Sequence, residues 1–184
     1  QAHRLLENRP ASVRLGGGRS HPLEAIATLD HVRFAGVDFR NVPSIFPTDS
    51  VRGSTSTLVS GNIGLETLSR FRVIMDYSHD RLYVLRNPKL AIAPFLKDRS
   101  GLFLVEKDSN FMVEFVAPGS PAQKAGFKAG ERVIQINQVP VGALQGKAWQ
   151  KAALGTLKAT AQGTTFVFTM EDGSTRQFKA ADFF

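Results

Sequence analysis

Cysteine is absent from the 184 residues of this sequence, and long apolar runs are absent as well. Without cysteine the chain can form no disulfide bond, present no thiol nucleophile and bind no zinc through thiolates. A transmembrane helix needs about 20 consecutive apolar residues, so no segment is expected to cross a membrane. The first residues do not resemble a signal peptide. Residues 1–8 look like the end of a helix, and we expect the chain to be part of a longer protein.

Histidines are few, and their spacing does not suit a metal ion. No two of them lie four residues apart with a glutamate beside them, which is a spacing that zinc sites use. We therefore predict no metal site and no cofactor. Ser120 lacks the G-x-S-x-G context of a nucleophilic serine, and we interpret it as a helix cap. The histidines are His3, His21, His31 and His79.

Basic residues exceed acidic ones, giving a net charge of +7. Nucleic-acid-binding proteins gather such charge on one face or along one helix. Here lysine and arginine are scattered along the chain and interrupted by apolar or acidic residues. We predict no nucleic-acid partner, and only weak, salt-sensitive attraction to anions.

The residue patterns predict a mainly β fold with short helices. Hydrophobic residues make up 42% of the chain, which is enough for a packed core. Pro88 and Pro94 mark residues 87–96 as a stiff linker between a first unit, 1–86, and a second unit, 97–184. Strands of the first unit are expected at Leu23–Leu29, His31–Val37, Phe39–Ile45, Arg72–Met75 and Arg81–Leu85.

Turn and cap signals divide the second unit. Ser120 as N-cap and Pro121 at the first helical position predict a short helix that ends before Gly126. Asp172 and Gly173 predict a tight hairpin. Strands are expected at Leu102–Val105, Phe111–Val116, Arg132–Ile136, Thr164–Met170 and Thr175–Lys179, and a helix at Gly146–Leu157.

Residues 119–141, GSPAQKAGFKAGERVIQINQVPV, resemble the PDZ domain of bacterial envelope proteases. The resemblance rests on the Gly-Ser-Pro-Ala turn, the one-turn helix closed by Ala-Gly, and the strand that ends in Asn-Gln before Val-Pro-Val. It implies a PDZ-like β-barrel over residues 97–184 that binds peptides or proteins.

A glycine-containing loop before an edge strand offers backbone N–H groups to a chain-terminal carboxylate, and the strand edge can accept a peptide as an extra strand. The alternative is that Gly101 forms a plain turn and that the apolar residues around it are core. The predicted substrate-binding residues are Ser100, Gly101, Leu102, Phe103, Leu104, Val105, Trp149 and Ala153.

Residues 61–77, GNIGLETLSRFRVIMDY, and the following RLYVL at 81–85 resemble the end of a retropepsin-like aspartic peptidase lobe. The resemblance implies a partial acid-protease β-barrel over residues 1–86. A phosphate-binding loop is excluded because neither the glycine spacing nor a following lysine fits, whereas a plain structural turn stays open. The residues implied to form the flap and to support the cleft are Gly16, Gly17, Gly18, Gly61, Asn62, Ile63 and Gly64.

Aspartic peptidases use two aspartates that share a proton, each in an Asp-Thr-Gly or Asp-Ser-Gly turn. No aspartate of this sequence has that context, so we assign no catalytic residue and expect the chain alone not to hydrolyse peptides. Asp76 is interpreted as a structural turn residue.

Three functions are compatible with these patterns. The chain is the C-terminal part of an aspartic endopeptidase whose PDZ domain recruits substrate or regulates access. Alternatively, it is a non-catalytic adaptor with a degenerate protease-like lobe, or a self-assembling module. The implied partners are peptide or protein substrates in the PDZ groove, the missing upstream lobe and a second copy of the chain. The resemblance implies a periplasmic or secreted location in the bacterial envelope.

Overall fold

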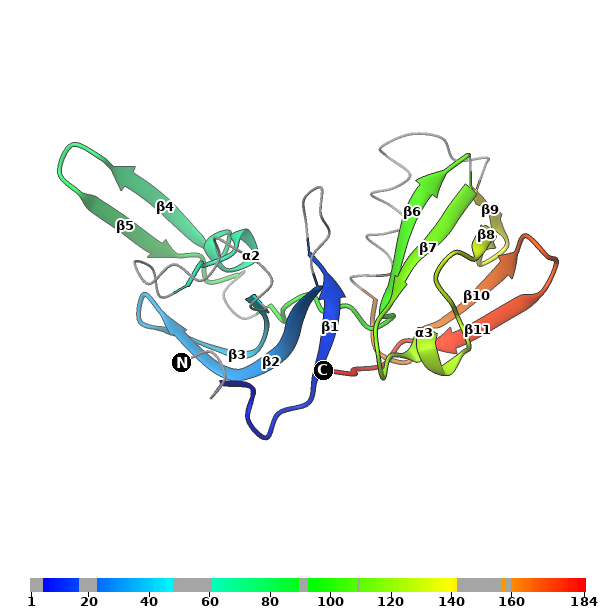
Figure 1. The fold of residues 1–184 in the computed structure, drawn as a ribbon. Coiled ribbons are helices and arrows are strands. Elements are labelled where there is room, and N and C mark those ends of the chain that lie inside the picture. The colour runs from blue at the N-terminus through cyan, green and yellow to red at the C-terminus, as the bar shows by residue number, and fades with distance from the viewer. Residues whose placement is uncertain are drawn as a thin grey trace.

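The computed structural model describes residues 5–16, 23–47, 61–89, 93–108, 110–141, 157 and 160–184 (Figure 1). Within these ranges the expectation of a mainly β fold with short helices is confirmed. No sheet of the described residues closes into a barrel. Several expected features lie outside the described residues, namely the first four residues of the chain, Gly17, Gly18, Trp149, Ala153 and the predicted helix at 146–157 up to its last residue.

The first sheet contains three antiparallel strands in the order β1-β2-β3: Ala11–Leu15, Leu23–Phe34 and Val37–Pro47. Both segments expected as strands between residues 23 and 37 are strand up to Phe34, but the break expected between them at residue 30 is absent. One continuous strand, β2, ends at Phe34, and the chain then reverses through Ala35 and Gly36. Both turn residues have positive φ, 49° and 75°, which is the conformation of tight two-residue hairpin turns.

Pro43 lies inside β3, opposite Thr28 of β2. A proline generally weakens a strand because it cannot donate a ladder hydrogen bond. β3 tolerates it because β3 is the last strand of its sheet.

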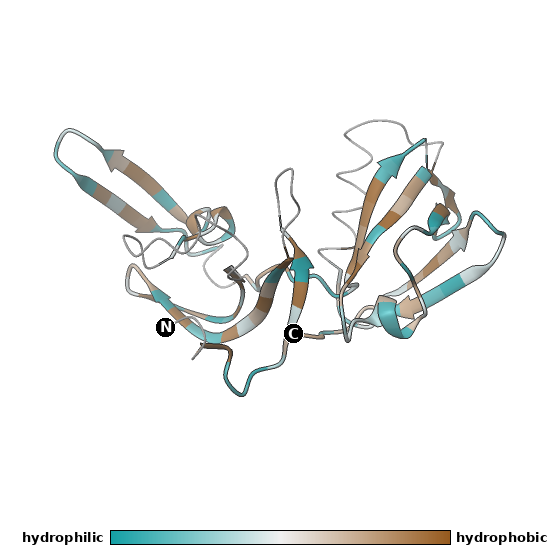
Figure 2. Ribbon diagram, in the orientation of Figure 1, coloured by the Kyte–Doolittle hydropathy of each residue, from teal (hydrophilic) through white to brown (hydrophobic). Residues whose placement is uncertain are grey.

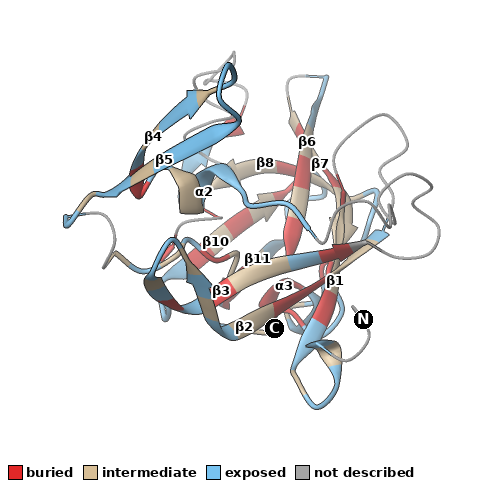
Figure 3. Ribbon diagram, turned by 90° about the vertical axis from the view of Figure 1, so that its left-hand side faces the viewer, coloured by how far each residue is buried: buried red, intermediate tan, exposed pale blue. Residues whose placement is uncertain are grey.

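A short helix and a hairpin complete the first unit. Helix α2 spans Leu65–Leu68, and strands β4, Phe71–Asp76, and β5, Arg81–Arg86, pair with each other alone among the described strands. The strands expected at Arg72–Met75 and Arg81–Leu85 are confirmed, and they pair as an antiparallel hairpin. Figure 3 shows β4 and β5 largely in the colour of exposed residues.

Asp76 closes the turn of this hairpin. Its carboxylate accepts the Ser78 hydroxyl at 2.6 Å and contacts His79 Nδ1 at 2.8 Å. The Ser78 hydrogen bond, followed by that of His79, lowers the pKa of Asp76. Its predicted role as a structural turn residue is confirmed.

Arg70 holds the hairpin base against residues 93–96. Its side chain is 5% exposed. Nε donates to the Glu66 carbonyl at 3.1 Å, Nη2 donates to the Pro94 carbonyl at 3.3 Å, and Nη1 donates to the Ala93 carbonyl. The guanidinium lies 3.8 Å from the centre of the Phe95 ring. A buried cation of this kind is stable because carbonyl oxygens and an aromatic face replace its water.

The second sheet has the order β11-β10-β8-β7-β6, with β9 paired to β8. The expected strands and the Asp172-Gly173 hairpin are confirmed within one or two residues at their ends. The strands are β6 Leu102–Lys107, β7 Asn110–Val116, β8 Arg132–Ile136, β9 Val139–Pro140, β10 Thr165–Met170 and β11 Thr175–Lys179.

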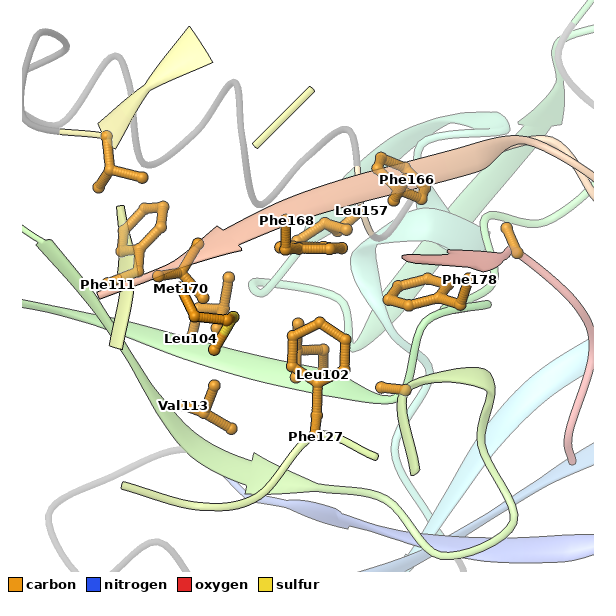
Figure 4. Packing of buried hydrophobic residues seen from close by; sticks show 14 residues of the cluster. Leu102, Leu104, Phe111, Val113, Phe127, Leu157, Phe166, Phe168, Met170 and Phe178 are labelled. Carbon is orange, nitrogen blue, oxygen red and sulfur yellow. The ribbon is translucent and has the colours of Figure 1, made fainter. Parts of the chain in front are cut away.

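One hydrophobic core fills the second unit. Figure 2 shows the hydrophobic residues of β6, β7 and β10, and Figure 4 shows their side chains turned toward one another. Phe166, Phe168 and Phe178 form a group of rings with centroids 5.4–6.2 Å apart. This core is separate from a smaller cluster built on Phe39, Val42 and Phe71 in the first unit. The second unit therefore has the interior that a stable domain needs.

Candidate functional site

The loop before β6 depends on Gly101. Its φ is +68°, a left-handed conformation that side chains other than glycine rarely adopt. A Cβ atom at this position would lie 2.2 Å from Ser120 Cβ and 3.2 Å from Ala117 Cβ. Backbone geometry and the close approach of α3 both require glycine here.

Helix α3, Pro121–Lys124, supports the loop from the other side. Ser120 Oγ accepts the Gln123 N–H at 3.2 Å, which confirms the predicted N-cap and its proline at the first position. The Ala122 N–H donates to the Ser100 carbonyl at 3.1 Å. The loop, the cap and the helix therefore form one hydrogen-bonded unit.

Asp98 occupies the inside of the loop. Its Oδ1 atom accepts the N–H of Ser100 at 2.8 Å, the Ser100 hydroxyl at 2.8 Å and the N–H of Gly101 at 3.2 Å. Ser100 Oγ in turn accepts the Leu102 N–H at 3.1 Å. Sequence reasoning missed Asp98, although its Asp-x-Ser spacing is a local signal for this kind of turn.

Strand β6 is the edge of the second sheet, and β7 is its one partner among the described strands. Leu102 and Leu104 are 5% and 2% exposed and belong to the core. Phe103 and Val105 are half-buried. Thus the predicted binding residues of β6 divide into two that face the core and two that do not.

A cleft of about 380 Å³ opens beside this loop. β6 and β7 line one side of it, and strands β1 and β3 of the first unit line the other. Most of its surface is apolar, and three charged side chains, Arg14, Glu66 and Asp98, reach it. The apolar lining residues include Val13, Leu15, Ile45, Leu102, Phe103, Phe115 and Phe184.

Phe184 contacts both units, and Phe183 and Phe184 line the cleft. The Phe184 carbonyl accepts Thr28 Oγ1 at 3.0 Å and also accepts Lys97 Nζ. Lys97 Nζ lies 3.5 Å from Asp182 Oδ2 and 4.6 Å from the centre of the Phe184 ring. Burial, opposed by the charge of Asp182, lowers the pKa of Lys97. Sequence reasoning did not identify this contact because Lys97 and Phe184 are 87 residues apart.

The structure describes some of the glycines proposed as flap and cleft residues of the first unit. Gly16 is buried at the end of β1, where an added Cβ would lie 2.8 Å from Glu24 Cδ. Residues 61–64 are exposed, and Gly64 precedes α2 as its N-cap. The cleft described above does not include any of these residues.

No group of three or more His, Asp or Glu side chains within the described ranges is arranged to hold a metal ion. None of the helices described is long and apolar enough to cross a membrane.

Comparison with known families identifies a PDZ domain at residues 112–156. The matched segment begins in β7 and includes α3, β8 and β9. The resemblance noted for residues 119–141 is thus confirmed for the PDZ domain. Comparison with the curated proteins gives no match.

Proposed function

We propose that this chain binds extended segments of other proteins through its PDZ unit, at the edge of β6. The observation that carries the proposal is that β6 ends its sheet beside a glycine loop and an apolar cleft, in a chain with a PDZ domain at residues 112–156. An edge strand can accept a peptide by main-chain pairing, while neighbouring pockets select side chains.

Peptide arrays test this proposal. The chain is expected to bind a subset of Val-, Ile- and Phe-rich peptides, and Phe103→Ser should weaken the binding because Phe103 lines the cleft. Val139→Ser is the matched control, since Val139 is an exposed apolar side chain on β9 and does not line the cleft. Equal losses in both variants, or no peptide bound by the parent chain, would contradict the proposal.

We further propose that the first unit derives from the end of a retropepsin-like lobe, and that the whole protein is an aspartic endopeptidase of the bacterial envelope. The resemblance of residues 61–85 supports this proposal, as does their arrangement: a glycine segment, the short helix α2 and the β4–β5 hairpin. The test is the coding sequence upstream of Gln1. An Asp-Thr-Gly or Asp-Ser-Gly turn there, whose Asp→Asn variant abolishes peptide hydrolysis, would support the proposal. Its absence would favour the adaptor.

Self-association is a second candidate function, favoured by the exposed side chains of the hairpin. Six of its large apolar or aromatic residues are about half exposed or more, namely Ile74, Met75, Tyr77, Leu82, Tyr83 and Leu85. An isolated two-stranded hairpin is marginally stable in water, so a covering partner would stabilise it.

A second copy of the chain fits this surface by charge. An antiparallel pairing of two β4 strands centred on Ile74 would set Arg72 opposite Asp76 of the other copy, twice. Sedimentation should then show a concentration-dependent dimer. Arg72→Asp should weaken that dimer and Arg86→Asp on β5 should not. A monomer at all concentrations would refute the pairing.

A further inference from the structure

The loop that leads into β6 carries its own carboxylate. Asp98 Oδ1 takes the N–H groups of Ser100 and Gly101, and the Ser100 hydroxyl takes that of Leu102. Three consecutive backbone donors are therefore bonded within the chain. Rows of such N–H groups are what captures an anion or a chain-terminal carboxylate.

We propose that Asp98 makes the β6 site select segments that lie inside a polypeptide chain and reject free C-termini. This inference rests on the proposed function and specifies its ligand. A ligand carboxylate at the loop would have to displace the Asp98 carboxylate or lie beside it, and two negative charges in contact repel each other. An internal segment offers only peptide groups and side chains, so it can pair with β6 without that repulsion.

The cations next to Asp98 in the sequence are engaged by other groups. Arg99 Nε donates to Asp182 Oδ1 at 2.7 Å, and Arg99 Nη1 donates to the Thr160 carbonyl at 2.9 Å. Lys97 pairs with Asp182 and the Phe184 carbonyl. In these contacts neither Lys97 nor Arg99 pairs with Asp98, so neither of them neutralises the negative charge of Asp98 at the loop.

The loop also lacks space for a second carboxylate. Ser100 is 1% exposed, and Gly101 is buried against Ser120, with no room for even a methyl group. Asp98 and Gly101 instead line the apolar cleft together with Phe103 and Phe115. The surroundings suit an uncharged, apolar segment that continues past the loop.

The test compares one array-selected Val- and Ile-rich peptide in three forms: free acid, C-terminal amide, and embedded in a longer peptide with amidated end. The parent chain should bind the amide and the embedded form within about twofold of each other in Kd, and should bind the free acid at least about tenfold more weakly because of the repulsion from Asp98. Asp98→Ala frees the backbone donors, so this variant should prefer the free acid by about tenfold, since bonds to an ionised acceptor are the stronger ones.

Two variants serve as controls. Asp172 accepts the N–H and hydroxyl of Ser174 at 2.9 and 2.6 Å, the same pattern in the β10–β11 turn. Asp172→Ala should therefore bind like the parent chain. Asp98→Asn keeps an acceptor in the loop and so preserves the fold, and its preference for the free acid should be smaller than that of Asp98→Ala.

The outcomes separate the inference from the proposed function. A parent chain that binds the free acid as tightly as the amide, or an Asp98→Ala variant that still binds the free acid more weakly than the amide or equally well, would overturn the selectivity and leave peptide binding intact. If neither the parent chain nor any variant binds any form, the proposed function fails, and the inference with it.

Discussion

Replacement of Gly101 by alanine should destabilise the second unit more than any other glycine-to-alanine change at its turns. The left-handed conformation at φ +68° costs a residue with a Cβ about 1–2 kcal/mol. The new methyl would also overlap Ser120 Cβ, which lies 2.2 Å from the ideal position. Relieving such an overlap in a packed site costs about 1–3 kcal/mol more. The sum is about 2–5 kcal/mol, a large fraction of the roughly 5–15 kcal/mol that holds a domain folded.

Gly119→Ala separates the conformational cost of a positive φ from the cost of the steric overlap. Gly119 has φ +74°, but an added Cβ would meet nothing within 4 Å. Its free energy of unfolding should fall only by the conformational cost, so the difference between the two variants measures the overlap. Urea unfolding followed by circular dichroism gives both values. Ser120→Gly should recover part of the loss in Gly101→Ala by removing the overlapping atom. Equal losses for Gly101→Ala and Gly119→Ala would refute the steric argument.

Three further outcomes follow from the described contacts. Ser120→Ala removes the N-cap of α3 and should cost about 1 kcal/mol in urea unfolding; no loss would contradict a stabilising role for this cap. Arg70→Met leaves three backbone carbonyls without their donor and removes the contact with Phe95, so a loss of about 2–4 kcal/mol is expected. The pKa of Asp76 is lowered from its ordinary value of 3.8, so its ionised carboxylate stabilises the hairpin turn at pH values above 3.8. This stabilisation is lost as the pH falls through the lowered pKa of the folded state. An NMR titration should place the Asp76 midpoint below 3.8, and Ser78→Ala should raise it; an unchanged midpoint would contradict the assigned cause.

Local signals predicted the features whose causes lie within a few residues. Ser120 and Pro121 fixed the start of α3 because cap and helix are adjacent in the chain. The Asp172-Gly173 hairpin was predictable for the same reason. Asp98 belongs to this group too, since its acceptor reaches only two and three residues ahead, and a search for Asp-x-Ser turns would have found it.

Features that depend on distant partners were not predictable from the sequence. β1 is a five-residue strand that pairs with β2, and its first residue, Ala11, lies opposite Ala27. The contacts of Thr28 and Lys97 with Phe184 span 156 and 87 residues. Predicting such contacts would require knowing how the two units meet, because sequence spacing carries no information about them.

The chain reversal at Ala35 was not predicted, for a different reason. Alanine rarely adopts a positive φ, so a sequence pattern does not indicate a turn whose first residue is Ala35. The following Gly36 was the signal that should have ended the predicted strand.

The measurement that tests the account most directly is backbone hydrogen exchange of the chain with and without a bound, end-blocked Val- and Ile-rich peptide. Pairing at the sheet edge should slow amide exchange in β6, residues 102–107, and should leave β11 at the opposite edge unchanged. Saturable binding that protects other elements and leaves β6 unaffected would contradict β6 as the binding edge.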